Sequence, residues 1–120
     1  MIMKDLTAKE TLSIVVCHED NPLAQELAEY ARQGIEEESM PALLLPATGN
    51  SLELSRMACE LSLLAVGVGI DKRGSISLTH FQMPADKPVL QSASGSDTRK
   101  ARLMGGNAAR LYKRIPFIFE

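Results

Sequence analysis

Leu63-Leu-Ala-Val-Gly-Val-Gly-Ile70 is the stretch of sequence that decides the fold class. Its residues are apolar or glycine on both alternating faces, so a strand formed here has no polar side to turn toward solvent. Strands of this kind lie in the middle of a sheet that is covered on both faces, which is where parallel strands are found. The segment therefore predicts a central strand in an α/β domain.

Two strand-then-helix patterns precede this segment. Thr11–Cys17 has the β-branched residues of a buried strand, and Pro22 is well placed in the first turn of a helix that follows. Apolar residues then recur at i, i+4, i+7/8 and i+12 as far as Ile35, which predicts an amphipathic helix of about four turns. Residues 41–46 are a second short apolar run, and a second helix is predicted over about 52–61.

The pattern changes after residue 70. Residues 75–80 alternate apolar and polar side chains, which predicts a half-exposed edge strand, and residues 88–90 fit a short final strand. The basic segment 99–114 is predicted to be helical, with an interruption at Gly105-Gly106 after which Asn107 caps a fresh helix. The order βαβαββ(β)α predicts a single compact α/β domain over 1–120, with a mainly parallel open sheet flanked by helices and a polar lead-in at 1–10.

Composition and charge exclude several classes of protein. The chain has 120 residues, 45% hydrophobic and 23% charged, which is ordinary for one folded domain. A net charge of −2 provides no general attraction to nucleic acid or to an anionic membrane. The longest nearly uncharged apolar run, 61–70, is about half of a membrane-spanning helix. The N-terminus has no apolar stretch of signal-peptide length, so Cys17 and Cys59 are expected to be reduced thiols of a cytoplasmic protein.

The charges are unevenly distributed along the chain. Four basic and eleven acidic side chains lie in residues 1–60, against nine basic and four acidic in residues 61–120. One acidic and one basic face are therefore expected, which suits a protein partner of complementary potential. The basic segment near the C-terminus is accordingly interpreted as a protein interface or a solvated helix rather than a site for nucleic acid. The apolar residues 115–119 either pack onto the domain or dock onto a partner.

The usual catalytic and cofactor motifs do not occur in this sequence. His18 and His80 lack neighbours at metal-ligand spacing, and no nucleophile elbow is present. Gly67-Val-Gly69 lies inside a strand pattern, where close packing of a helix over small residues explains it better than a dinucleotide site. Asp71 follows the central strand at the edge where open α/β sheets bind ligands, but a turn residue explains it equally well.

Glu36-Glu-Glu38 is the most informative polar cluster. Three carboxylates at the C-terminal end of a helix repel each other and face the negative end of the helix dipole. A solvated helix end and a site for a partner or a cation are both open interpretations. A magnesium ion would accept a carboxylate oxygen from this cluster, but the remaining ligands would have to come from elsewhere, for example another chain.

Three segments in register carry a family resemblance. Gly34-Ile-Glu-Glu-Glu38 with Pro41, the run Leu64–Asp71, and Gly106-Asn-Ala-Ala-Arg-Leu-Tyr-Lys113 followed by Ile115-Pro-Phe117 resemble the small subunits of diol and glycerol dehydratase reactivases. The similarity runs from about residue 12 to residue 117. Ser39-Met40 and Arg114 depart from the residues common in that family.

The resemblance implies a non-catalytic subunit of an ATP-dependent, chaperone-like reactivating factor. Two small chains would assemble with two large ATPase chains, and ATP or ADP would bind to the large subunit. The small subunit would resemble the medium subunit of the adenosylcobalamin-dependent dehydratase in fold. By exchanging with that subunit, it would loosen the inactivated dehydratase so that damaged cobalamin leaves.

The resemblance also assigns residues. It implies that Glu37 reaches a Mg²⁺ ion shared with the large subunit, and that this chain binds no cofactor alone. Glu36, Glu38, Asn107 and Arg110 are predicted partner-interface residues, although a helix cap and a solvated cation also explain Asn107 and Arg110.

Two other functions stay open from the sequence. One is the dehydratase medium subunit itself, although that chain normally carries N-terminal and other extensions, and the other is a stand-alone domain that binds a small ligand near Asp71. The sequence does not distinguish a diol from a glycerol dehydratase, nor the open cytoplasm from a bacterial microcompartment.

Overall fold

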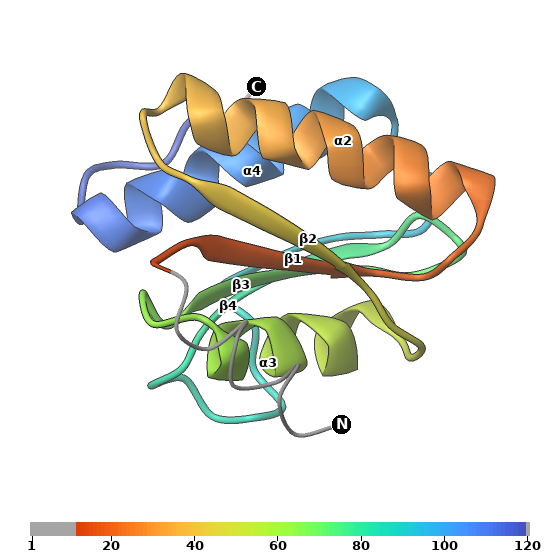
Figure 1. The fold of residues 1–120 in the computed structure, drawn as a ribbon, viewed down its shortest axis with the longest axis horizontal. Helices are drawn as coiled ribbons and strands as arrows, with labels where there is room; N and C mark the ends of the chain where they lie inside the picture. Colours follow the sequence, from red (N-terminus) through yellow and green to blue (C-terminus); the bar gives the residue numbers. More distant parts are fainter. Residues whose placement is uncertain (1–11, 120) are drawn as a thin grey trace.

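The computed structural model describes residues 12–119, so the predicted polar lead-in at 1–10 lies outside the described residues. The elements follow the predicted order of strands and helices (Figure 1). They are β1 (Ile14–His18), α2 (Pro22–Glu37), β2 (Ala42–Pro46), α3 (Ser51–Leu61), β3 (Val66–Ile70), β4 (Ile76–His80), β5 (Leu90–Ser92) and α4 (Thr98–Lys113).

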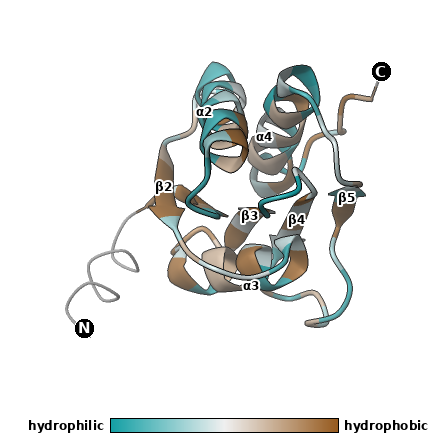
Figure 2. Ribbon diagram, turned by 90° about the vertical axis from the view of Figure 1, so that its right-hand side faces the viewer, coloured by the Kyte–Doolittle hydropathy of each residue, from teal (hydrophilic) through white to brown (hydrophobic). Residues whose placement is uncertain are grey.

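A five-stranded sheet forms the middle layer, with strand order β2-β1-β3-β4-β5. The β2-β1-β3 half is parallel, whereas β4 pairs antiparallel with β3 and β5 pairs antiparallel with β4. Helices α2 and α4 cover one face and α3 covers the other (Figures 1 and 2). The predicted α/β class and the central place of β3 are confirmed, and the sheet is mixed because the last two strands are joined by hairpin-like connections rather than helices.

Strand β4 is not the half-exposed edge strand that its alternation predicts. It lies between β3 and β5, and Leu78 is paired with Leu90 of β5. Its polar residues Ser77 and Thr79 are buried because they face α3 rather than solvent. Ser77 Oγ lies 2.9 Å from Ser51 Oγ, and Ser55 Oγ donates to Thr79 Oγ1 at 3.1 Å. The polar face of this strand is therefore a helix contact.

Helix α4 continues through the glycine pair that was expected to interrupt it. Asp97 caps its N-terminus by accepting a hydrogen bond from the backbone N–H of Lys100 at 2.8 Å, so Asn107 is a helix-interior residue and not a cap. A Cβ atom on Gly105 would lie 2.0 Å from the carbonyl oxygen of Ala31 in α2. The glycine is therefore explained by the close crossing of α2 and α4, a tertiary contact that local propensity does not encode.

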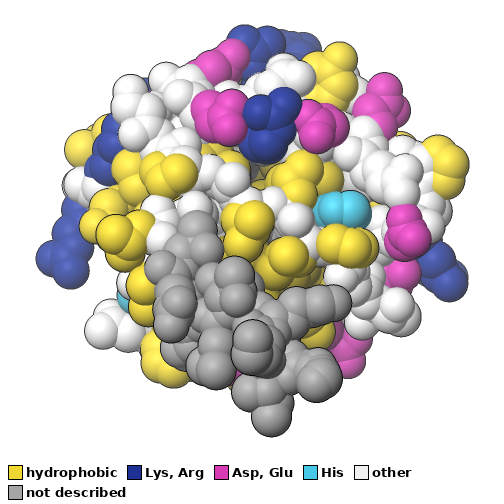
Figure 3. All heavy atoms as spheres, in the orientation of Figure 1, with side chains coloured by type: hydrophobic (Ala, Val, Ile, Leu, Met, Phe, Trp, Pro, Cys, Tyr) yellow, Lys and Arg dark blue, Asp and Glu magenta, His cyan; other side chains and the backbone are white. Residues whose placement is uncertain are grey.

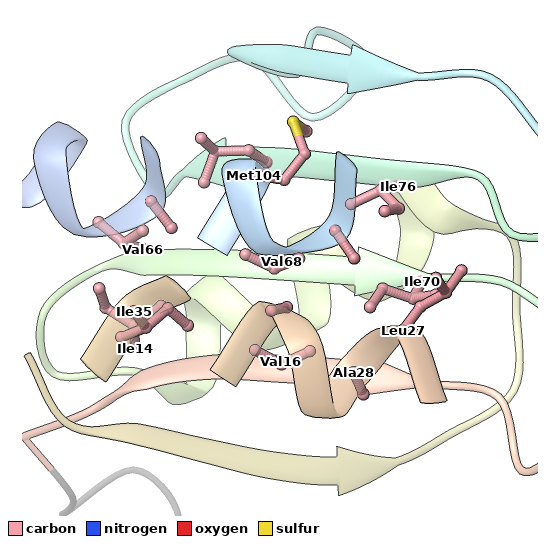
Figure 4. Close-up of a cluster of buried hydrophobic side chains, with 14 of the residues drawn as sticks. Ile14, Val16, Leu27, Ala28, Ile35, Val66, Val68, Ile70, Ile76 and Met104 are labelled. Carbon is pink, nitrogen blue, oxygen red and sulfur yellow. The ribbon is translucent and has the colours of Figure 1, made fainter. Parts of the chain in front are cut away.

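The core has two parts, one on each face of the sheet. The larger part fills the space between the sheet and α2 and α4, where side chains such as Val16, Val68 and Ile35 meet (Figure 4). The smaller part lies between the sheet and α3 and includes Val15 and Cys17 of β1 with Leu54 and Ala58 of α3. Helix α3 sits so close to β3 that a Cβ atom on Gly67 would lie 2.2 Å from the backbone nitrogen of Cys59. The packing interpretation of the Gly67-Val-Gly69 motif is therefore confirmed.

Strand β2 is one edge of the sheet and is short and uncharged. Its residues Ala42–Leu45 are only partly buried. Figure 3 shows this face of the molecule, with neighbouring acidic and basic side chains above a band of hydrophobic side chains. Within residues 12–119, no helix has the length and apolar character that crossing a membrane requires.

Both cysteines are buried and free, in agreement with the expectation of reduced thiols. Burial raises the pKa of Cys17 to about 12 and the pKa of Cys59 to about 11. Because the thiolate is the reactive form, both groups are expected to be inert in the folded protein at neutral pH.

The raised pKa values of the two thiols predict that the protein loses stability in alkali. Thiols of the unfolded chain ionise near pH 8.5, well below the pKa values in the folded protein. Their contribution is therefore fully present below about pH 8.5 and is lost as the pH rises toward 11 to 12. We expect the free energy of unfolding of the parent protein, measured by urea denaturation, to fall between pH 8.5 and pH 10. The fall should be smaller in the double variant Cys17→Ala/Cys59→Ala, and equal slopes would contradict this account.

Candidate partner interface at the C-terminal end of helix α2

The three consecutive carboxylates lie in the last turn of α2 and at its C-cap residue Glu38, and the last turn has no basic residue. Glu36 lies within 2.8 Å of the Arg32 guanidinium one turn earlier on the same helix, and Arg32 also contacts Glu29. The Glu36 carboxylate is therefore paired within α2 and lies outside the α2–α4 contact described next. Its predicted place in a partner interface stays a prediction.

Glu37 is paired with Arg102 of α4. Arg102 Nε donates to Glu37 Oε1 at 3.0 Å, and the guanidinium also contacts the second carboxylate oxygen. These hydrogen bonds lower the pKa of the Glu37 carboxyl below its ordinary value. Both side chains are about half exposed, so water and salt screen the pair. The carboxylate is thus charged, accessible, and held by a partner that another cation could displace.

Titration of Glu37 tests this pairing. We expect the side-chain carboxyl carbon of Glu37, followed by NMR, to titrate below its ordinary pH range in the parent protein. In the variant Arg102→Gln the midpoint should move upward toward that range, because the guanidinium no longer stabilises the charged form. Arg99→Gln, which removes a neighbouring cation from the same helix, is the matched control. A Glu37 midpoint that Arg102→Gln leaves in place would contradict the ion pair.

Glu38 is held by the far end of α4. Arg110 contacts the Glu38 carboxylate at 3.2 Å, and the Lys113 ammonium contacts the Glu38 carbonyl oxygen. The same Arg110 guanidinium donates to the carbonyl oxygen of Pro116 at 3.0 Å. The acidic end of α2 is therefore tied through Arg110 to the chain that follows α4. The expected acidic and basic regions of the sequence meet inside this one molecule.

Asn107 is only 2% exposed and holds the C-terminal residues in place. Its Nδ2 donates to the carbonyl oxygen of Ile118 at 2.9 Å, and its Oδ1 accepts from the backbone N–H of Ile118 at 2.8 Å. One amide side chain thus satisfies both backbone groups of a residue eleven positions later. Asn107 would therefore influence an interface by fixing the position of Ile118.

The crossing of α2 and α4 creates a hollow of about 390 Å³. Glu37, Glu38 and Asn107 line this hollow, and Arg110 adjoins it through its contact with Glu38. The helices can approach this closely because Gly34 has no side chain. A Cβ atom at this position would lie 2.0 Å from the carbonyl oxygen of Arg102. The remaining lining residues are Gly34, Arg99, Arg102, Leu103, Gly106 and Ile118.

Sequence reasoning missed Arg102 and Ile118 at this site. Arg102 lies 65 residues from Glu37, and nothing in its local sequence marks it as the partner of that carboxylate. The weak signal was the glycine pattern, since Gly34 and Gly105 permit the close approach of two helices that brings the charges together. Glu37, Glu38, Asn107 and Arg110 therefore gather at one place with Arg102 and Ile118, whereas Glu36 lies outside it.

This chain does not form a complete metal centre in the part that the structure describes. No group of three or more His, Cys, Asp or Glu side chains is arranged to hold an ion among residues 12–119. Glu37 fits the role of one oxygen ligand to Mg²⁺, with the other ligands supplied from outside the chain. The role of Glu37 as a ligand to Mg²⁺ stays a prediction of the family resemblance.

Asp71 has a structural role that the sequence left open. Its Oδ1 accepts hydrogen bonds from the backbone N–H groups of Arg73 and Ser75, both at 3.0 Å. Such bonds are typical of an Asx turn. The interpretation as a turn residue is supported, and this carboxylate oxygen is engaged by the turn itself.

Comparison with known proteins decides the family. A family model described as "Dehydratase medium subunit" matches residues 13–118, nearly the whole chain. This chain belongs to the dehydratase medium-subunit family. Among curated members of similar sequence, it is 40% identical over 86 residues to the propanediol dehydratase-reactivating factor small subunit of Salmonella typhimurium, covering 70% of this chain and 72% of that one. It is 34% identical over 86 residues to the probable glycerol dehydratase-reactivating factor small subunit of Citrobacter freundii, covering 70% and 74%.

Two solved structures of reactivating factors have the same fold. A glycerol dehydratase reactivase chain superposes with a TM-score of 0.81 at 26% identity, covering 91% of this chain and 98% of that chain. A diol dehydratase-reactivating factor complexed with ADP and Mg²⁺ gives a TM-score of 0.79 at 28% identity, covering 92% and 100%. The family resemblance and fold expected from the sequence are confirmed, and the homologues are reactivating-factor small subunits.

Proposed function

We propose that this chain is the small, non-catalytic subunit of an ATP-dependent reactivating factor that serves an adenosylcobalamin-dependent diol or glycerol dehydratase. The main support is the structural match to a glycerol dehydratase reactivase chain, which covers 91% of this chain and 98% of that one. The half-exposed Glu37 carboxylate, which lines the hollow and bonds to Arg102, is consistent with the same assignment. In this proposal the ATPase activity and the bound nucleotide belong to a larger partner subunit, and two large chains assemble with two small ones.

The working step is an exchange of subunits. A chain that shares the fold of the dehydratase medium subunit can occupy the place of that subunit, which loosens the inactivated holoenzyme so that damaged cobalamin leaves. The membership of this chain in the medium-subunit family supports the exchange, because related folds present related surfaces to one partner. The free thiols support a reducing cytoplasm, with or without an enclosing microcompartment.

Glu37 is proposed to bridge the two subunits. Mg²⁺ supplies a divalent positive charge that carboxylate oxygens bind well, and it usually completes its shell with ligands from several sources. In this chain Arg102 already holds the carboxylate in its charged form at an exposed position. When the ion of the partner approaches, Glu37 would exchange the guanidinium for the metal. Glu36, Glu38 and Arg110 would surround this contact.

The variant Glu37→Gln tests the bridge. Light scattering on the chain co-expressed with the large ATPase subunit should show a stable mixed complex in Mg²⁺. Glu37→Gln should lower the affinity by at least tenfold in Mg²⁺ and have little effect when EDTA has removed the metal. Glu29→Gln is the matched control, since Glu29 is a similarly exposed carboxylate of α2 that bonds to Arg32 and does not line the hollow. Equal assembly of the Glu37 variant and the parent would overturn the bridge.

Addition of inactivated dehydratase and ATP tests the exchange. The proposed function predicts that this chain then moves from the large subunit to the dehydratase. A second candidate, the medium subunit of the dehydratase itself, is favoured by the description of the family model. That candidate predicts instead a catalytically active holoenzyme when this chain replaces the native medium subunit.

A further inference from the structure

The residues after α4 form a hydrophobic tail that is fixed in place without being buried. We define the tail as residues 115–119. Ile118 is 42% exposed and Phe119 is 69% exposed, and Ile115 is also exposed. Phe117 and Phe119 pack edge to face with ring centroids 6.2 Å apart. In Figure 2 this hydrophobic segment lies beside α4 at the edge of the molecule.

Several hydrogen bonds determine the position of the tail. Asn107 bonds both the N–H and the carbonyl of Ile118, and Arg110 bonds the carbonyl of Pro116. The backbone N–H of Ile115 donates to the Arg110 carbonyl at 3.1 Å. A terminal segment that buries little apolar surface gains little stability by being ordered. The bonds therefore hold Ile118 and Phe119 in position while their side chains remain open to solvent.

The tail is continuous with the site of the proposed cation bridge. Ile118 lines the same hollow as Glu37, and the Arg110 that bonds Pro116 also holds Glu38. A partner that brings a metal ion to Glu37 therefore reaches the apolar side chains of the tail at the same time. Exposed aromatic and aliphatic side chains in a fixed geometry are typical of the anchors at the centre of protein interfaces.

We propose that the tail is an apolar anchor for the large partner subunit, which would receive Ile118 and Phe119 in a socket next to its metal ion. Asn107 is the positioning residue that sets the geometry of this anchor. The inference rests on the proposed function, because it takes the chain that supplies the ion to Glu37 as the occupant. It adds a second contact, which does not depend on the metal.

Affinity for the large subunit, measured with and without Mg²⁺, tests the anchor. Ile118→Ser and Phe119→Ser should each raise the dissociation constant at least tenfold under both conditions. Leu63→Ser and Phe81→Ser are matched controls, because each side chain is 49% exposed and lies away from the hollow. These controls should leave the dissociation constant within about twofold. Unchanged binding by both tail variants would overturn the anchor.

Asn107→Ala tests the positioning role. It should raise the dissociation constant to a similar extent although both anchor side chains remain, and it should speed hydrogen exchange at the Ile118 amide. Normal exchange with weakened binding would overturn this role, because Asn107 would then act without the tail.

The outcomes separate the anchor from the proposed function. Weak binding by Glu37→Gln with normal binding by the tail variants refutes the anchor alone. Normal binding by Glu37→Gln with weak binding by the tail variants refutes the metal bridge and leaves the anchor. Loss of a homodimer of this chain on tail substitution, with unchanged binding to the large subunit, would refute the anchor by assigning the tail to a second copy.

Discussion

Substitution of Gly105 by alanine is expected to lower the free energy of unfolding by about 3 kcal/mol. The new Cβ atom would lie 2.0 Å from the carbonyl oxygen of Ala31, and backbone cannot move aside as a flexible side chain can. Alanine is the better helix former by about 1 kcal/mol, so the loss must appear against a favourable propensity. Urea denaturation followed by circular dichroism measures the change.

The neighbouring glycine supplies the control for this substitution. A Cβ atom on Gly106 would meet nothing closer than the Gly34 carbonyl oxygen at 3.7 Å, an ordinary contact. Gly106→Ala should therefore stabilise the protein by about 0.5 to 1 kcal/mol. Similar effects of the two substitutions would refute the close crossing of α2 and α4. The crossing also brings Arg102 to Glu37, so Gly105→Ala should disturb the Glu37 titration without altering a charge.

Substitution of Gly69 by alanine should damage the opposite face of the sheet to a similar degree. Its Cβ atom would lie 2.2 Å from the carbonyl oxygen of Ser51 and 2.3 Å from the backbone nitrogen of Ser55. Helix α3 would have to move away from the sheet, which breaks the hydrogen bond between Ser51 and Ser77 and the one that Ser55 donates to Thr79. We expect a loss of about 3 kcal/mol and a fall of about 10 °C in the midpoint of thermal unfolding.

Gly95→Ala is the control for the loss of stability expected of Gly69→Ala. Gly95 has a φ angle of +83° and no atom within 4 Å of a Cβ position, so its substitution introduces backbone strain without a clash. That strain should destabilise the protein by about 1 kcal/mol. A Gly69→Ala variant that loses no more stability than Gly95→Ala would contradict the tight packing of α3 on β3.

The sequence predicts the central strand and the order of elements because those signals are local. Val66–Ile70 has no polar face, and only a central strand can bury both of its sides. The alternation of β4 misleads because Ser77 and Thr79 bond to serines of α3, and a buried hydroxyl pair has the same pattern as a solvated face. Gly105 misleads in the same way, since a glycine required by a neighbouring helix resembles one that ends a helix.

The candidate site, like the fold, is predicted from the sequence only where the signal is local. The acidic run of α2 is visible in the sequence because three carboxylates contradict the helix dipole at that end. The compensating cations Arg102 and Arg110 come from another helix, and the sequence places them only in a generally basic region. The role of Asn107 depends on a single tail residue, Ile118, whose position follows from tertiary structure.

The 65-residue separation of Glu37 and Arg102 has a consequence for how the protein is made. During translation α2 emerges early, whereas α4 and the tail emerge after every other described element. Until α4 docks, the three carboxylates repel one another at an open helix end, and the hollow has only one wall. A nascent or truncated chain therefore lacks the finished surface, and under the proposed function its ability to bind the large subunit would report that α4 has docked.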